Sequence, residues 1–356
     1  MNKLQSKDKL YIKNFGPLKD VSITLDKINV LIGSNGSGKS VLAKIITIVL
    51  DMKTHMINED EFFKKFQDYN IDFLTNDTII KFYVKDDIIF EIRNKEIYKL
   101  NDKFDPIVQE MIRPNQENII KAQKLTTQYI PAERNLISLF SNSLSTFVVS
   151  GVPLPKFLLH FSSHYEKARQ EIRELDFLDM RYVNNGKDII YYSKDEYLDL
   201  EHSSSGVQSA LPLYLATKYF VNKHRSIIIE EPEQNLFPKA QVDTIKYIIE
   251  QVDSDNDLFV MTHSPYVLSA LNILLYAHKV ANLNDESRKE VSEVYAENIW
   301  INPDEFSAYF LENGIARDIK SSNGMINDNE IDDISQNIAG EFDDLLDIFR
   351  NFKNDK

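Results

Sequence analysis

Two runs of polar residues in this sequence follow apolar runs, and the first of them suits phosphate binding. Residues 33–40, GSNGSGKS, fit the pattern G-x-x-x-x-G-K-[ST] at every fixed position. Glycines let consecutive backbone N–H groups point inward, and the helix that follows adds the partial positive charge of its N-terminus. In such a loop Lys39 reaches the β- and γ-phosphates and Ser40 binds Mg²⁺. The predicted loop contacts are Gly33, Asn35, Gly36, Ser37, Gly38, Lys39, Ser40 and Val41.

The second run, IIIEEPE from Ile227, ends an apolar segment in acidic residues. Its isoleucines predict a buried strand, and the C-terminal ends of such strands face the crevice where α/β folds bind ligands. We expect Glu230 to act through the Mg²⁺ shell and Glu231 to polarise the attacking water. A solvated acidic turn is the simpler alternative, and the glycine loop upstream favours the catalytic interpretation.

Two weaker signals accompany these runs. The segment SSSGVQS places Ser205 and Gly206 at the head of an apolar helix, where an N-cap alone would explain the serines. His263 follows a second buried strand, which we expect beside the acidic strand. At that place the imidazole could sense a γ-phosphate.

The elements that must position these residues alternate between strand and helix. Residues 9–33 predict two or three strands, the last of them at 28–32, and residues 40–50 carry apolar positions at helical spacing. A hairpin is expected around TIIKFYVKDDIIFEI. A helix is expected between Pro155 and Leu178, followed by a hairpin that turns at Asn185-Gly186. We also expect strands around ENIWINP and FSAYFL, and a terminal amphipathic helix from Ile331 to Phe349.

Composition narrows the class of protein. The 356 residues are 43% hydrophobic and 27% charged, as in soluble globular proteins, and they include no cysteine. That excludes thiol chemistry and suits a cytoplasmic location. The apolar runs are too short for a membrane span, and no secretory signal is visible. The net charge of −14 disfavours indiscriminate binding to DNA or to anionic lipid, although a local basic groove would still allow DNA.

The sequence divides into four parts by these patterns. Residues 1–150 form an N-terminal lobe with the glycine loop and an inserted β-hairpin region, and residues 151–200 form a helical arm or lid. Residues 201–283 form a C-terminal lobe, and residues 284–356 add strands and an amphipathic helix to the same domain. The expected fold is α/β, with a mixed central sheet and an N-terminal antiparallel β-subdomain.

Together the motifs resemble those of the ABC-type ATPase superfamily. The resemblance rests on KNFGPLKD before the glycine loop, on YIPAER, SSSGVQS, IIIEEPEQNLFP and MTHSPYVL, and on FSAYFLENG. These segments are similar to the soluble branch that includes recombination ATPases and overcoming-lysogenization-defect (OLD) nucleases. They are most similar to stand-alone AAA-family ATPases of the AAA_15 and AAA_21 types, several of which serve phage defence.

This resemblance implies a homodimer that encloses two ATP molecules. The glycine loop of one protomer would face the SSSGVQS signature of the other, so that Ser205 and Gly206 contact the γ-phosphate in trans and Gln208 braces the loop. Glu231 would be the general base and His263 a switch histidine. The implied Mg²⁺ ligands are Ser40, Glu230 and Gln128. Gln128, or Glu133 and Arg134, occupies the place of the glutamine loop, and Lys13 and Asn14 match positions near the nucleotide.

The departures from the family pattern also inform function. The signature carries serine and valine where transporters have leucine and a second glycine, and Glu230 stands where aspartate is commoner. No toprim-type nuclease domain is visible after His263, so an effector such as a nuclease or toxin would be a separate protein. Three hypotheses follow: a dimerising ATPase that controls an effector, a DNA-repair ATPase, and a non-hydrolysing scaffold gated by ATP. A transporter ATPase is a distant fourth.

Overall fold

The computed structural model describes most of the chain. The described residues are 7–99, 126–140 and 149–327, apart from 52, 55–56, 85, 152, 222 and 254, together with 341–342 and 345–346. The expected terminal amphipathic helix lies outside them, except for residues 341–342 and 345–346, which are helical and include the exposed Phe342 and Leu345.

Within the described residues the strands form two sheets, and the larger one is mixed. Across it the strands lie in the order β6 (Glu96–Lys99), β5 (Asp87–Arg93), β4 (Ile79–Val84), β1 (Asp8–Phe15), β2 (Leu18–Leu25), β15 (Ile315–Asp318), β14 (Phe306–Glu312), β3 (Ile28–Ile32), β13 (Asp257–Thr262), β12 (Ser226–Glu230) and β7 (Thr127–Ile130).

Helices and 3₁₀ turns lie between the strands along the chain. They are α1 (Lys39–Leu50), α2 (Glu59–Asp68), α5 (Asn135–Phe140), α7 (Lys156–Glu171), α8 (Ser205–Phe220), α9 (Pro238–Gln251), α10 (Pro265–Ala281) and α11 (Asp285–Val294), with the 3₁₀ turns η2 (Ala132–Arg134), η3 (Leu200–His202), η4 (Glu297–Ile299) and η5 (Pro303–Glu305).

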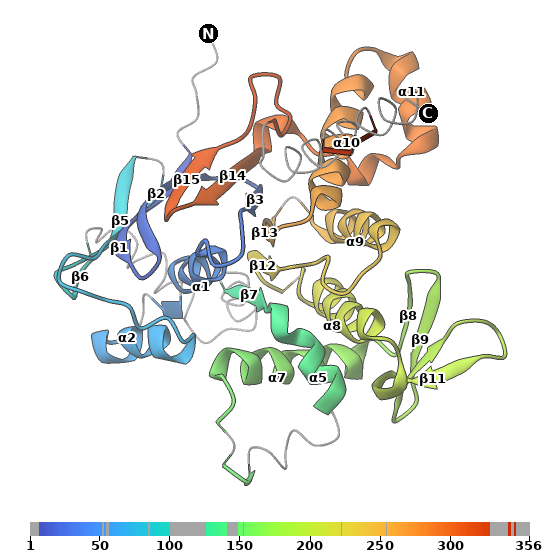
Figure 1. Ribbon diagram of the computed structural model, residues 1–356, viewed down its shortest axis with the longest axis horizontal. Helices are drawn as coiled ribbons and strands as arrows, with labels where there is room; N and C mark the ends of the chain where they lie inside the picture. Colours follow the sequence, from blue (N-terminus) through green and yellow to red (C-terminus); the bar gives the residue numbers. More distant parts are fainter. Residues whose placement is uncertain are drawn as a thin grey trace, which may run out of the picture.

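The two halves of the large sheet differ in strand direction. β14, β3, β13, β12 and β7 are parallel neighbours, whereas β6, β5, β4, β1 and β2 form antiparallel pairs. Every residue of β3 and β12 is buried, which explains their unbroken apolar runs. Figure 1 shows α1 on one side of the parallel strands and α8, α9 and α10 on the other. The predicted α/β class with a mixed sheet and an antiparallel β-subdomain is therefore confirmed.

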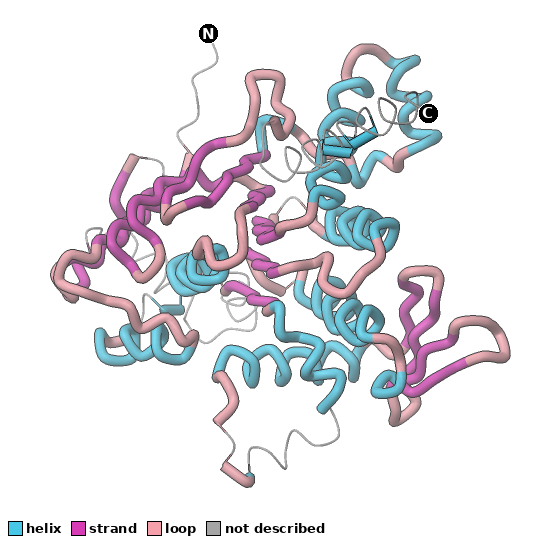
Figure 2. Tube along the Cα trace, in the orientation of Figure 1, coloured by secondary structure: helices cyan, strands magenta, loops and turns pink. Residues whose placement is uncertain are grey.

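The second sheet is antiparallel and lies beyond α8. Its order is β11 (Tyr197–Asp199), β10 (Asp188–Tyr191), β9 (Met180–Asn184) and β8 (Glu174–Phe177), and Figure 2 shows it as a separate group of strands. The segment expected to be a helical arm is thus one helix, α7, followed by a sheet. Leu175, expected on the same helix, lies in β8. From residue 174 the polar and apolar side chains alternate, which is a strand pattern.

The C-terminal part also departs from expectation. β14 confirms the strand expected at FSAYFL, but the strand expected at ENIWINP is wrong, because this segment begins with η4 and continues without strand structure to η5. The indole Nε1 of Trp300 donates to the carbonyl oxygen of Tyr295 at 2.9 Å, which turns the chain back on itself. In the described part of the chain, no helix combines the length and apolar character that a bilayer span requires.

Candidate active site

The glycine loop joins β3 to α1 and needs glycine at two positions for different reasons. Gly38 has a φ of 104° and caps α1, and a Cβ there would lie 2.8 Å from Leu18 Cδ2. A Cβ on Gly33 would lie 2.3 Å from the carbonyl oxygen of Leu311 in β14. The loop therefore lies tightly against two neighbouring segments with its N–H groups at the head of a helix, as phosphate binding requires.

Lys39 and Ser37 supply polar groups inside this loop. The Lys39 Nζ donates to the carbonyl oxygens of Gly33 at 2.6 Å and Ser34 at 2.9 Å, and burial lowers its pKa. Within the part of the chain that the structure describes, the buried Ser37 hydroxyl has no hydrogen-bond partner. A hydroxyl without a partner can bond to a phosphate oxygen, and the Lys39 ammonium can exchange its carbonyl partners for phosphate oxygens. Both groups therefore suit phosphate binding.

Ser40 connects the loop to the acidic end of β12. Its Oγ donates to Glu230 Oε2 at 2.8 Å, and the hydroxyl of Tyr129 donates to Glu230 Oε1 at 2.7 Å. Glu230 is buried, and this burial raises the pKa of its carboxyl group. A serine hydroxyl beside a carboxylate is a donor set that Mg²⁺ prefers, so these two residues fit the expected ion.

The strand β7 contributes Tyr129 to this group, and sequence reasoning missed it. The Gln128 Nε2 donates to the carbonyl oxygen of Tyr129 at 2.9 Å, and its buried Oε1 has no hydrogen-bond partner among the described residues, so its role as a Mg²⁺ ligand stays a prediction. Successive side chains of a strand point to opposite faces, so only one of these two residues can reach Glu230. The sequence contains this alternation, but it does not say which of the two faces of the strand meets Glu230.

Glu231 and His263 lie at the ends of adjacent parallel strands. Glu231 has a φ of 46°, and its N–H donates to the carbonyl oxygen of Met261 at 2.8 Å. The Glu231 Oε1 lies 3.9 Å from His263 Nδ1, and both side chains are partly open to solvent. The structure therefore brings the two predicted catalytic residues together at the same edge of the sheet as Lys39 and Ser40.

A third acid, Glu233, supports His263 and was also missed. Its Oε1 accepts from the Thr262 hydroxyl at 2.7 Å and from the His263 N–H at 3.0 Å, and it lies 3.7 Å from His263 Nδ1. The Glu233 side chain is buried. Glu233, the third acid in EEPEQ, was visible in the sequence, but its partners Thr262 and His263 lie at the end of another strand.

The signature residues begin α8. Ser204 caps the helix through a bond from the Val207 N–H, and Ser204 and Ser205 are exposed. A Cβ on Gly206 would lie 2.8 Å from the carbonyl oxygen of Asn235, so α8 starts tightly against the loop that follows β12. Gln208 Nε2 donates to the carbonyl oxygens of Leu200 at 3.3 Å and Glu201 at 3.0 Å, which ties η3 to α8.

Lys13 and Asn14 lie at the end of β1, and both are exposed. The Asn14 Nδ2 donates to the carbonyl oxygen of Asp77 at 3.3 Å. Pro17, in the turn after β1, would lie 3.2 Å from a Cβ on Gly38, so this turn borders the phosphate loop. Their contacts to a nucleotide stay a prediction.

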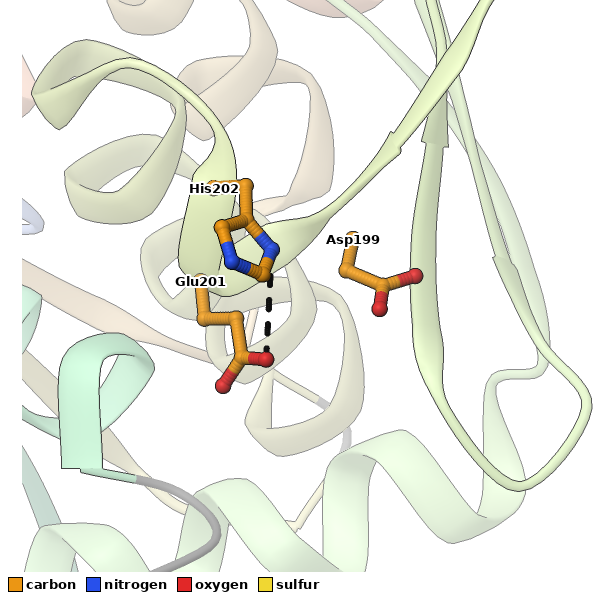
Figure 3. A group of neighbouring side chains, drawn as sticks. All are labelled: Asp199, Glu201 and His202. Atoms are coloured by element: carbon orange, nitrogen blue, oxygen red, sulfur yellow. Dashed lines mark ion pairs between the residues drawn. The ribbon is translucent and has the colours of Figure 1, made fainter.

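A second group of possible metal ligands lies beside η3. Asp199, Glu201 and His202 have ligand atoms within 4.8 Å of one another (Figure 3). His202 and Glu201 are exposed, and the Lys187 ammonium lies 3.7 Å from Asp199 Oδ2. An open group with a competing cation is a poorer cation site than the pair of Ser40 and the buried Glu230.

Comparisons with known proteins identify the family of this chain. The family model AAA_15, described as AAA ATPase domain, matches residues 7–174 and 154–268. An uncharacterized protein of Methanocaldococcus jannaschii, MJ1542, is 30% identical over 95 residues, which are 27% of this chain and 12% of that protein. The chain thus spans only a small part of this relative.

Two solved structures show similarity over most of the chain. The SMC head domain from Thermotoga maritima is 14% identical, with a TM-score of 0.42, and 87% of this chain and 97% of that chain are covered. The ADP conformation of MJ1267, an ATP-binding cassette of an ABC transporter, is 15% identical with a TM-score of 0.38, and the coverages are 87% and 89%. Since the family model matches well over half of the chain, this protein belongs to the AAA ATPase domain family.

Proposed function

We propose that this protein hydrolyses ATP with Mg²⁺ and that hydrolysis controls a partner protein. The observation that carries the proposal is the bond from Ser40 to Glu230, which are 190 residues apart in the chain. It joins the phosphate loop to the acidic strand end and leaves Glu231 and His263 at the same edge. This combination supports hydrolysis rather than nucleotide binding alone.

The chain's own residues divide the chemistry among them. Lys39 and the loop N–H groups would hold the phosphates, and Ser40 and Glu230 would hold Mg²⁺, which supplies charge neutralisation on the phosphate oxygens when bound. Glu231 would take the proton of the attacking water, and His263 would contact the terminal phosphate. Tyr129 and Glu233 would orient Glu230 and His263 through the hydrogen bonds described above.

We further propose that two copies of the chain enclose the nucleotide. Ser204 and Ser205 are exposed at the head of α8, as donors for a phosphate bound to another protomer would be. ATP would then hold the dimer together and hydrolysis would release it. Such a cycle suits control of an effector, for which a nuclease or toxin in a phage-defence system is the proposed class.

The test is phosphate release by the wild type and by Glu231→Gln. The wild type should turn over Mg²⁺-ATP, and the substitution should slow kcat by about 10²–10⁴-fold, the range for loss of a general base. It should still bind ATP, so proteins that co-purify with it report the partner. Equal, negligible turnover in both proteins would contradict hydrolysis and favour an ATP-gated scaffold, and salt-sensitive capture of DNA would favour a repair ATPase.

A further inference from the structure

Arg134 is a fully buried arginine whose bonds go to the backbone. It is 0% exposed, at the end of η2 between β7 and α5. The guanidinium donates to four carbonyl oxygens. These are Pro131 at 3.2 Å, Ser209 at 3.0 Å, Glu230 at 2.7 Å and Glu231 at 2.6 Å. Burial lowers the pKa of Arg134 to about 10, so it stays protonated at neutral pH.

One side of this contact lies beside a proline in α8. Pro212 has no N–H, so the carbonyl of Gln208, four residues earlier, loses its helical partner. The Ser138 hydroxyl donates to that carbonyl at 2.7 Å, and Arg134 Nε donates to the next one, Ser209. The interrupted turn of α8 is thus held by residues from outside the helix.

The other side of the contact is the catalytic turn. Arg134 donates to the carbonyls of both Glu230 and Glu231, the expected metal ligand and general base. Glu231 has the left-handed φ of 46°, which a side-chain-bearing residue keeps only when its surroundings hold it there. Arg134 is therefore one rigid group bonded to the signature helix and to the backbone of both acids.

We propose that Arg134 is a positioning residue that couples the orientation of α8 to the placement of Glu231. When a second copy engages the head of α8, the shift of the helix reaches the base through the guanidinium fork. This inference rests on the proposed ATPase function. It adds a route by which occupancy of the signature sets the rate of hydrolysis.

The first test is Arg134→Lys, which keeps the charge but cannot bridge several carbonyls with one planar fork. We expect kcat to fall about 100-fold, as when a catalytic group is misplaced by roughly 1 Å, while the Kd for Mg²⁺-ATP stays within about threefold. Arg169→Lys is the matched control. Arg169 bonds to the carboxylates of Asp188 on β10 and Glu166 on α7, away from the site.

The second test does not depend on tolerating a change at a buried arginine. Pro212→Ala returns an N–H to the Gln208 carbonyl and regularises α8. We expect a higher Tm, because a proline inside a helix costs stability, and a kcat lowered about fivefold, because the Gln208 carbonyl no longer needs the Ser138 hydroxyl as its partner. Ser138→Ala should slow kcat to a similar extent, whereas Ser269→Ala, which removes an exposed hydroxyl bonded to the Pro265 carbonyl in α10, should not.

A third readout needs no turnover. At dilutions where the protein stays monomeric, binding of Mg²⁺-ATP at the loop should change hydrogen exchange across residues 205–214 through the same contact in the reverse direction, and Arg134→Lys should abolish that change. If the wild type does not hydrolyse ATP, the proposed function fails and this exchange experiment alone decides the coupling. If the wild type is active, and Arg134→Lys and Pro212→Ala retain its kcat and its exchange response, the coupling is overturned while the ATPase function stands.

Discussion

The phosphate loop and the signature segment both lie at the head of a helix, but their polar groups form different hydrogen bonds. In the loop, Lys39 is buried and bonded to carbonyls of its own chain, and Ser40 is bonded to Glu230. In the signature, Ser204 and Ser205 are exposed. Ser40 is exposed as well, so the two helix heads differ in their bonding: Lys39 and Ser40 bond to other segments of the site, whereas the Ser204 hydroxyl caps its own helix.

This difference suggests that the two segments play unequal parts in one site. The loop is assembled within a single chain, where Glu230, Tyr129 and Glu233 complete it. The start of α8 is fixed by the bonds from Gln208 to η3 and by the close approach of Gly206 to Asn235, while its serines are exposed. A rigid segment with open donors is what a phosphate on a second protomer would need, and the following predictions test that comparison.

The largest expected effect comes from blocking the exposed signature at the head of α8. Ser205→Arg places a bulky cation at the head of α8, and we expect kcat to fall at least about 100-fold, as after loss of a catalytic hydrogen-bond donor. The Kd of the monomer for nucleotide should stay within about threefold, because the loop half is intact. Titration calorimetry and phosphate release measure the two quantities. Ser193→Arg, at an exposed serine between β10 and β11, is the control, and an equal loss of kcat there would contradict a specific role for Ser205.

A smaller effect is expected from Glu233, in the part of the site that one chain assembles by itself. Glu233→Gln keeps the shape but removes the charge that faces His263, and we expect kcat to fall about tenfold, the rate equivalent of one weakened charge-assisted bond. In a His263→Ala background the same substitution should add little. Glu286→Gln, at an exposed acid of α11, should be silent. Additive losses in the double variant would show that Glu233 acts elsewhere.

The smallest effect concerns stability. Burial raises the pKa of Glu230, so the folded protein holds this proton more tightly than the unfolded chain. The carboxyl group therefore favours folding most below its ordinary pKa, and stability falls as the pH rises through the ordinary and the raised values. Glu230→Gln should increase Tm at pH 8 by about 2 °C, with a smaller gain near pH 4. A gain that is equal at both pH values would contradict a buried, ionising Glu230.

The sequence was sufficient for local features of the fold and site. The strand expected at 28–32 is β3, and the hairpin around TIIKFYVKDDIIFEI is β4 and β5, because alternation and unbroken apolar runs are properties of a few neighbouring residues. The glycine loop was equally visible, since its pattern lies within eight positions.

Features that depend on distant partners were not visible. Arg134 bonds to carbonyls of residues 75 and 96 positions away, and no spacing rule reports such contacts. Tyr129 was passed over for its neighbour Gln128, because sequence alone does not say which face of β7 meets Glu230. Leu175 kept a helical spacing with earlier residues although its own neighbours follow a strand pattern, and the tertiary structure favoured the strand.

The most direct test of the shared site is to mix two inactive proteins. Lys39→Ala lacks a working loop and Ser205→Arg lacks a working signature, but their heterodimer would contain one site with both halves intact. An equal mixture should recover about one quarter of wild-type turnover, since half of the dimers are mixed and each has one of two sites. If the mixture stays as inactive as its components while both proteins remain folded, each site is completed within one chain and the account of a shared site is contradicted.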